Sequence, residues 1–227
     1  MAFARNARAI ARKAMHQIDP GLDDRFANVI RFLANFPEFA KKEKGLEIGE
    51  AKYIERQATA FWRSRQIKAP KEPSTIPDEM VSFVLANYFD VTESRLRGIR
   101  KTHALSMAAE NLVGELLEQY LASILEPAGW IWCSGSTVKS VDFVKPPKSN
   151  GGKWSLLQVK NRSNSENSSS SKVREGTTIE KWHRTFAKKA GSNWDQFPDK
   201  SSAALLSEAK FKSFSKKYLR QAKKGLK

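Results

Sequence analysis

Cysteine, histidine and long apolar runs are all scarce in this chain, and each scarcity excludes a class of structure. Cys133 is the only cysteine, so an intrachain disulfide is impossible and a cysteine-based zinc site is unsupported, which fits a reducing compartment. The three histidines have no paired spacing, which argues against a histidine-based catalytic or metal site. No apolar run approaches the roughly 20 residues needed to cross a bilayer, so we expect no membrane-spanning segment and no membrane partner.

Acidic residues are scarce in the second part of the chain, although basic residues are plentiful throughout. The 227 residues have a formal net charge of +16. Residues 1–138 hold 19 Lys and Arg against 17 Asp and Glu, whereas residues 139–227 hold 21 against 7. The second part therefore has a net charge of +14, which predicts a polyanion such as nucleic acid as its partner.

The length and the hydrophobic content of 40% predict one folded domain or two closely joined ones. Residues 1–101 are expected to be helical and carry no recognisable catalytic motif. We interpret them as a support or dimerisation region, with direct contact to nucleic acid as the alternative. Residues 102–227 are expected to hold an α/β core and to end in a basic helix. Helices are expected at about residues 23–33, 47–65, 78–88, 104–125 and 202–227.

Alternating residues predict three strands, at 130–134, 140–144 and 154–160. Proline and glycine residues between the last two strands favour a hairpin connection. A period of two places Gln158 and Lys160 side by side on one face of the third strand, near Asp142 on the second.

Asp142, Gln158 and the backbone carbonyl group of Val159 are candidate ligands for Mg²⁺, because this ion takes hard oxygen ligands in near-octahedral geometry. Lys160 is placed to orient and help deprotonate an attacking water and to offset charge that builds on a phosphate. The combination suits phosphodiester hydrolysis. A lysine at the end of a strand is also an ordinary feature of a solvated strand end, so a purely structural interpretation stays open.

The residues from Lys160 onward resemble a known superfamily. The segments Lys160–Ser171, Arg174–Thr177 and Lys181–Arg184 are similar to the catalytic segment of type II restriction endonucleases of the PD-(D/E)xK superfamily. Within that superfamily, the chain resembles the SinI-like group that cuts GGWCC sites. The resemblance covers roughly residues 107–186.

Two positions depart from the superfamily pattern. Gln158 stands where a second carboxylate is usual, and Val141 stands where proline is usual. The glutamine leaves the implied metal site with one fewer negative charge.

The helix expected at 104–125 carries glutamates, and the resemblance implies that one of them supports the metal. Gly114-x-x-x-Glu118 resembles the superfamily pattern, so Glu118 is our first choice and Glu110 our second. A solvated helix face is the alternative for either one. The apolar stripe of this helix, which starts at Leu105, is expected to pack on the sheet.

Residues after Lys160 are candidates for DNA contacts. The segment Ser163–Ser171 is either a flexible link or a loop whose polar side chains donate to phosphates or base edges. Thr177-x-x-Glu180 predicts a capping box that opens a helix, on which Lys181 and Arg184 share a basic face. The candidate DNA-binding residues are Arg162, Asn164, Ser165, Asn167, Lys172, Arg174, Lys181 and Arg184.

The resemblance implies an α/β fold with a restriction-endonuclease-like mixed β-sheet core flanked by helices, after a helical N-terminal region. It implies Mg²⁺-dependent cleavage of double-stranded DNA at a specific sequence by a homodimer in the bacterial cytoplasm. A companion DNA methyltransferase would protect the host. The alternatives are a DNA repair or junction-resolving nuclease of the same fold, and a non-catalytic nucleic-acid-binding protein.

Overall fold

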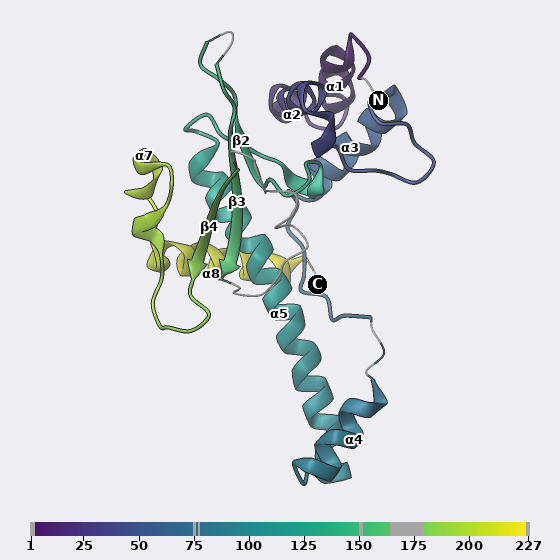
Figure 1. The fold of residues 1–227 in the computed structure, drawn as a ribbon, viewed down its shortest axis with the longest axis vertical. Helices are drawn as coiled ribbons and strands as arrows, with labels where there is room; N and C mark the ends of the chain where they lie inside the picture. Colours follow the sequence, from purple (N-terminus) through teal and green to yellow (C-terminus); the bar gives the residue numbers. More distant parts are fainter. Residues whose placement is uncertain (1–2, 75, 77, 150–151, 164–178, 226–227) are drawn as a thin grey trace.

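The computed structural model describes residues 3–74, 76, 78–149, 152–163 and 179–225, and shows a body built on a β-sheet with a helical arm projecting from it (Figure 1). The helices are α1 (Ala7–His16), α2 (Asp23–Asn35), α3 (Ala51–Arg63), α4 (Glu79–Tyr88), α5 (Glu93–Leu125), α7 (Lys200–Ala203) and α8 (Glu208–Lys224). The strands are β1 (Ile131–Trp132), β2 (Phe143–Lys145), β3 (Ser155–Arg162) and β4 (Ile179–Thr185).

The strands form one mixed sheet in the order β1-β2-β3-β4. β2 is antiparallel to both β1 and β3, whereas β4 runs parallel to β3. The hairpin predicted between the second and third strands is confirmed, with Phe143 opposite Leu157. The expected α/β class, with a mixed sheet and a helical N-terminal region, is also confirmed.

The prediction of a helix opened by Thr177 is wrong, because Ile179–Thr185 forms β4. Ile179 and Trp182 have a spacing that suits an amphipathic helix, but β-branched and aromatic residues suit a strand equally well. The strand is favoured over the helix because β4 pairs with β3 along its whole length. This pairing satisfies backbone N–H and C=O groups of β3 that would otherwise lie unpaired at the edge of the sheet. The side chain of Trp182 is buried, and its Nε1 donates to the Asn193 carbonyl oxygen at 2.9 Å.

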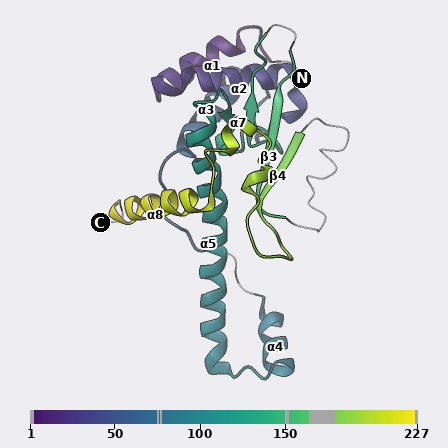
Figure 2. The same ribbon diagram turned by 90° about the vertical axis from the view of Figure 1, so that its left-hand side faces the viewer.

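Helices cover both faces of the sheet (Figure 2). On one face, α1, α2 and α3 form a core with Ile131 and Leu156. On the other, α5 and α8 form a second core with Trp132, Leu157 and Val159. Successive residues of β3 therefore alternate between the two cores, as the period of two requires.

Most of the predicted helices are confirmed. α4 begins where predicted, and the Oδ1 atom of Asp78 accepts a hydrogen bond from the Met80 N–H at 2.9 Å as its N-terminal cap. The basic helix expected at the C-terminal end is present as α8, which buries Phe211 and Tyr218 in the second core. Within the described part of the chain, every helix is too short or too polar to span a bilayer.

The helix expected at 104–125 begins earlier, at Glu93, so α5 crosses residue 101 without a break. The division of function between residues 1–101 and 102–227 stays a prediction. Leu112 and the apolar residues after it are buried, but Leu105 lies beyond the body and is exposed, so its predicted packing on the sheet is wrong.

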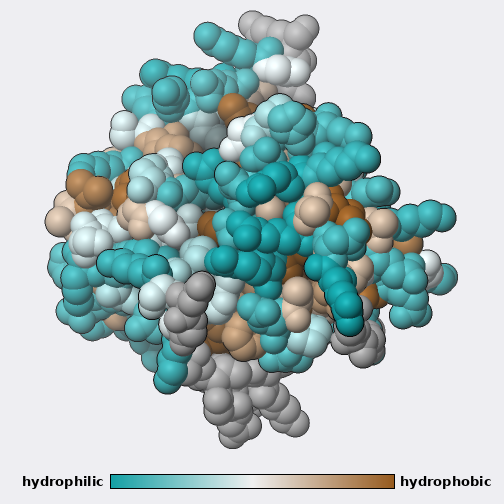
Figure 3. Space-filling model, turned by 90° about the horizontal axis from the view of Figure 1, so that it is seen from above, coloured by the Kyte–Doolittle hydropathy of each residue, from teal (hydrophilic) through white to brown (hydrophobic). Residues whose placement is uncertain are grey.

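The arm, defined here as residues 78–107, consists of α4 and the first half of α5, and it projects along the long axis of the molecule (Figures 1 and 2). The opposite end of the molecule, seen from above, is largely hydrophilic with scattered apolar side chains (Figure 3).

Candidate active site

Asp142 lies one residue before β2 and is anchored against the middle of the sheet. Ser140 has a φ of 59°, which ends the extended conformation and makes the strand shorter than predicted at this end. The Asp142 N–H donates to the Leu157 carbonyl oxygen at 2.9 Å, and its carbonyl oxygen accepts from the Cys133 N–H at 2.8 Å. Its Oδ2 accepts from the Val159 N–H at 2.7 Å. Backbone and side chain together fix this carboxylate beside β3.

Glu118 approaches the same place from α5. Its Oε2 accepts a hydrogen bond from the Trp132 Nε1 at 2.8 Å. Burial raises the pKa of the Glu118 carboxyl, and the charge of Asp142 raises it further. Burial also raises the pKa of Asp142, although the hydrogen bond from Val159 and the charge of Lys160 act against this rise. Two buried carboxylates are therefore close enough for one to oppose the ionisation of the other.

β3 supplies Gln158 and Lys160, which lie on the same face of the strand by alternation. Gln158 is buried, with 4% of its surface exposed, and Lys160 is partly buried. The positive charge of Lys160 lowers the pKa of both Asp142 and Glu118. The structure thus brings together Asp142, Val159, Lys160 and Glu118, and Gln158 directly precedes Val159 in β3.

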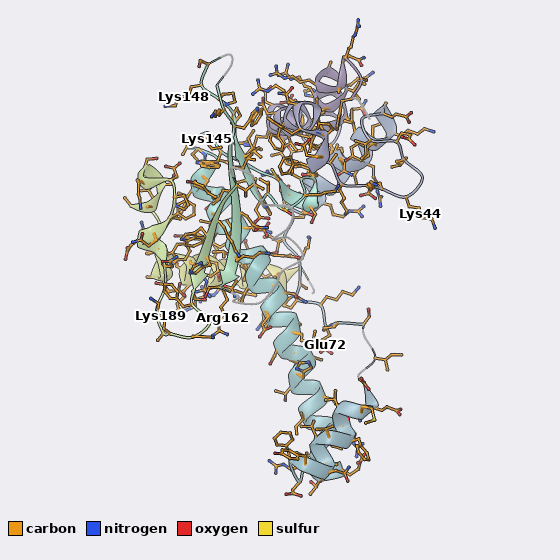
Figure 4. The ribbon with its side chains drawn as sticks, viewed as in Figure 1. Lys44, Glu72, Lys145, Lys148, Arg162 and Lys189 are labelled. Carbon is orange, nitrogen blue, oxygen red and sulfur yellow. The ribbon has the colours of Figure 1, made fainter. Side chains whose placement is uncertain are left out.

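Glu110 does not join this group. It lies about two turns from Glu118 on α5 and lines a separate hollow of about 530 Å³. Arg162, Arg184 and Lys189 line the same hollow. Figure 4 shows Arg162 and Lys189 near each other at one end of the sheet. Glu110 is therefore associated with basic side chains and not with Asp142.

Arg184 is held by contacts within the chain. Its Nε donates to the Asn161 Oδ1 at 2.9 Å, and its Nη1 pairs with the Glu208 Oε1 at 2.7 Å. The guanidinium also lies over the Phe211 ring, with 5.2 Å to the centroid. Because β4 is a strand, Lys181 and Arg184 lie on opposite faces, which corrects the shared basic face expected from a helix.

Of the other candidate DNA-binding residues, one set lies within the described residues and the other does not. Arg162 ends β3, and its Nε donates to the Phe186 carbonyl oxygen at 3.4 Å. Most of the serine-rich segment lies outside the described residues, and so do the candidates Asn164, Ser165, Asn167, Lys172 and Arg174. The DNA-binding roles of both sets stay predictions.

Two residues near the site were missed from the sequence. Trp132 carries an indole N–H that needs an acceptor when buried, and this could have indicated a nearby carboxylate. His183 lies opposite Lys160 in the parallel register, and its Nε2 is buried without a partner among the described residues. The spacing of the histidines argued against a role for His183, and its position beside Lys160 could not be foreseen, because this register exists only if residues 179–185 form a strand.

Comparison with known proteins identifies the enzyme class. The model of the SinI restriction endonuclease family matches residues 7–221. The type II restriction enzyme Eco47I of Escherichia coli is 48% identical over 221 residues, which cover 96% of each chain. The type II restriction enzyme SinI of Salmonella infantis is 48% identical over 225 residues, which cover 97% of each chain.

These matches run almost from end to end and include both the N-terminal helices and the site around Asp142. They confirm the predicted resemblance and the predicted class of type II site-specific deoxyribonuclease, which acts on double-stranded DNA. The chain belongs to the SinI restriction endonuclease family.

Proposed function

We propose that Asp142, Glu118, Gln158 and the Val159 carbonyl group form the metal site of this endonuclease, and that Lys160 acts beside them in Mg²⁺-dependent phosphodiester hydrolysis. The observation that carries the proposal is the convergence of two buried carboxylates on one lysine. Three separate elements supply these groups: α5, the residue before β2, and β3.

The donor set fits a hard divalent cation. Asp142 and Glu118 together carry more negative charge than Lys160 offsets, and burial makes such an imbalance costly. A divalent cation held by Asp142 and Glu118 would remove that cost. No group of three or more His, Cys, Asp or Glu side chains suited to a metal occurs in the described ranges, so in this proposal the protein's further ligands are neutral oxygens.

Val159 and Gln158 are suited to provide these neutral oxygens. In a strand, the N–H and C=O groups of one residue point to the same side. The Val159 N–H points to Asp142, so its carbonyl oxygen lies on the Asp142 side as well. Gln158 adds an amide oxygen without adding charge, which suits a site where two carboxylates already oppose each other.

Bound Mg²⁺ polarises the phosphate and makes a bound water easier to deprotonate. Lys160 donates hydrogen bonds that orient the attacking water and offset negative charge on the phosphate oxygens as it builds. Trp132 holds the Glu118 carboxylate in one orientation, and the Val159 N–H does the same for Asp142. These two hydrogen bonds support a site whose carboxylates are oriented before DNA binds.

We further propose that two copies act together on a palindromic or near-palindromic site, with one catalytic centre for each DNA strand. The net charge of +14 over residues 139–227 supports phosphate binding on the catalytic side of the molecule. A companion DNA methyltransferase acts on the same site as a functional partner, and both enzymes work in the bacterial cytoplasm.

The deciding experiment incubates phage and plasmid DNA with the protein, with Mg²⁺ or with EDTA. Discrete bands that require Mg²⁺ are expected from the wild-type protein, and intact DNA from Asp142→Asn. Asp195→Asn is the matched control, because Asp195 is exposed and distant in the chain from the site. Nicking that depends on branched structure would instead indicate a repair nuclease. Shifted but intact DNA would indicate a binding protein.

A further inference from the structure

The arm exposes an apolar surface of unusual extent. Nine of the thirteen large hydrophobic side chains exposed in the described chain lie within it. At about half exposure each offers roughly 100 Å², so together they present on the order of 900 Å², where a standard interface needs about 800 Å² from each partner. The nine residues are Met80, Val81, Phe83, Val84, Tyr88, Phe89, Ile99, Leu105 and Met107.

α4 has the composition of a buried helix. Its residues are apolar on all sides, yet within α4 only Ser82 is buried. Ser82 accepts a hydrogen bond from the Arg100 Nε at 3.0 Å, which ties α4 to α5 through a polar contact. A helix that is hydrophobic all round is normally covered on all sides. A second body must therefore cover the outer side of α4.

Two adjoining hollows follow α5 within the arm. One is shallow, largely open to solvent and runs along Gly98 and Thr102, and the other, of about 500 Å³, lies between α4 and α5. Ile99 and His103 line both hollows, so the two are continuous. A Cβ atom added at Gly98 would meet no atom within 4 Å, so a partner helix could approach the α5 backbone closely there.

The charges of the arm are arranged so that a second arm fits it. Residues 78–94 contain four acids and no base, whereas residues 95–107 contain four Lys and Arg and no acid. Among the described residues, no ion pair joins the acids of the arm to its bases. The acidic α4 side of one copy is therefore complementary to the basic α5 side of another.

We infer that the arm is the dimer interface: α4 of each copy lies in the hollow along α5 of the other copy, around a two-fold axis. This inference rests on the homodimer proposed above and names its surface. The arrangement is reciprocal, as a two-fold interface requires, and it brings the acids in and beside each α4 close to the bases of the partner's α5. DNA fits this surface poorly, because residues 78–94 would repel phosphate and the whole arm carries equal numbers of acids and bases.

The first test measures molecular mass by sedimentation. Gly98→Leu fills the hollow, so we expect a dimer for the wild-type protein and a monomer for this variant at micromolar concentration. Gly114→Leu is the matched control, because Gly114 lies in the same helix and its Cβ would also meet nothing within 4 Å. Circular dichroism establishes that both variants are folded. A dimeric Gly98→Leu protein would overturn the inference.

The second test locates the contact in an otherwise wild-type interface. Protomers with Phe83→Cys are mixed with protomers with Thr102→Cys and treated with a bismaleimide that reaches about 10 Å, the spacing of packed helices. Cys133 is buried and should not react. We expect a covalent heterodimer from this pair and none when Leu205→Cys replaces Phe83→Cys. Equal cross-linking in both mixtures would contradict the arrangement.

The outcomes also separate this inference from the proposed function. If the wild-type protein is dimeric but neither arm test gives the expected result, the homodimer stands and the arm is not its interface. If the wild-type protein is monomeric even with DNA, both the homodimer and the arm interface are excluded. The Asp142→Asn cleavage test then still decides whether the proposed catalytic site is correct. Arm variants that keep the dimer and lose DNA affinity would instead assign the arm to DNA.

Discussion

Two tryptophans close together in the chain each donate an indole N–H to a carboxylate, yet the two carboxylates differ. Trp130 Nε1 donates to the Asp199 Oδ2 at 2.6 Å, and Trp132 Nε1 donates to the Glu118 Oε2 at 2.8 Å. The pKa of Asp199 is lowered to about 2, whereas the pKa of Glu118 is raised.

The neighbours of each carboxylate explain the difference. Burial acts against ionisation of Asp199, but hydrogen bonds from Ser201 and Trp130 and the nearby Lys145 outweigh it and lower its pKa. Burial dominates at Glu118, and the charge of Asp142 adds to it. The fold itself compensates the charge of Asp199, whereas under the proposed function a cation would compensate the pair formed by Asp142 and Glu118. In that proposal, Asp199 serves stability and Glu118 serves catalysis.

Asp142→Asn is the change with the largest expected effect, and it addresses the catalytic side of this comparison. The amide keeps an acceptor for the Val159 N–H but removes a charged ligand, so cleavage should fall by roughly 10³-fold or more. The free energy of unfolding should stay the same or rise, because a buried charge is lost. Plasmid cleavage rates and urea unfolding measure the two effects. A variant that cuts at the wild-type rate would remove Asp142 from the site.

Gln158 gives the next largest effect. Gln158→Leu keeps bulk and loses the amide oxygen, so cleavage should fall by roughly 10²-fold. Gln158→Glu keeps the reach and adds one charge, so it should retain measurable cleavage, bind Mg²⁺ at least as well, and bind DNA less well without metal. Cleavage assays and calorimetry with Mg²⁺ test the pair. If the leucine variant cuts as fast as the wild type, Gln158 is not a ligand.

Asp199→Asn addresses the stabilising side of the comparison. The folded pKa of about 2 lies below the usual aspartate value, so the charge of Asp199 stabilises the fold above about pH 4, and this contribution disappears as the pH falls through 2. Removing it should lower the free energy of unfolding by about 1–2 kcal/mol at pH 7 and by almost nothing near pH 2. Urea unfolding at both pH values is the measurement, and cleavage at pH 7 should be unchanged.

Trp132→Phe has the smallest expected effect and tests the contact between tryptophan and carboxylate itself. It removes the indole donor but keeps most of the aromatic packing, so Glu118 loses its fixed orientation and cleavage should fall several-fold, equivalent to about 1 kcal/mol. Trp130→Phe is the matched control and should cost stability with little loss of cleavage. Equal effects of both variants on cleavage would show that the two carboxylates do not divide their roles in this way.

The sequence predicted the local part of the site well and the long-range part poorly. Asp142, Gln158 and Lys160 lie in or beside strands with clear alternation, so their proximity followed from a hairpin. β4 was missed because the spacing of Ile179 and Trp182 also suits a helix, and only the parallel partner β3 decides between the two. The ion pair of Arg184 with Glu208 joins two elements that local pattern does not connect.

The early start of α5 was missed for a related reason. Residues 93–103 are mostly polar or small, with only Leu96 and Ile99 as large apolar positions, so periodicity began only near residue 104. α4 shows the opposite relation between composition and burial. Its apolar composition is typical of a buried helix, but its large apolar side chains are exposed in the single chain.

The uninterrupted α5 also limits how the length of this chain can change. Each residue inserted into an α-helix turns everything beyond it by about 100° and moves it by about 1.5 Å. One residue added between Leu105 and Glu118 would therefore point the arm in a new direction relative to the catalytic centre, although every side chain of both would be unchanged. An insertion of seven residues would nearly restore the direction and lengthen the spacing by about 10 Å. Substitutions in this stretch should thus be tolerated far more readily than single-residue insertions or deletions.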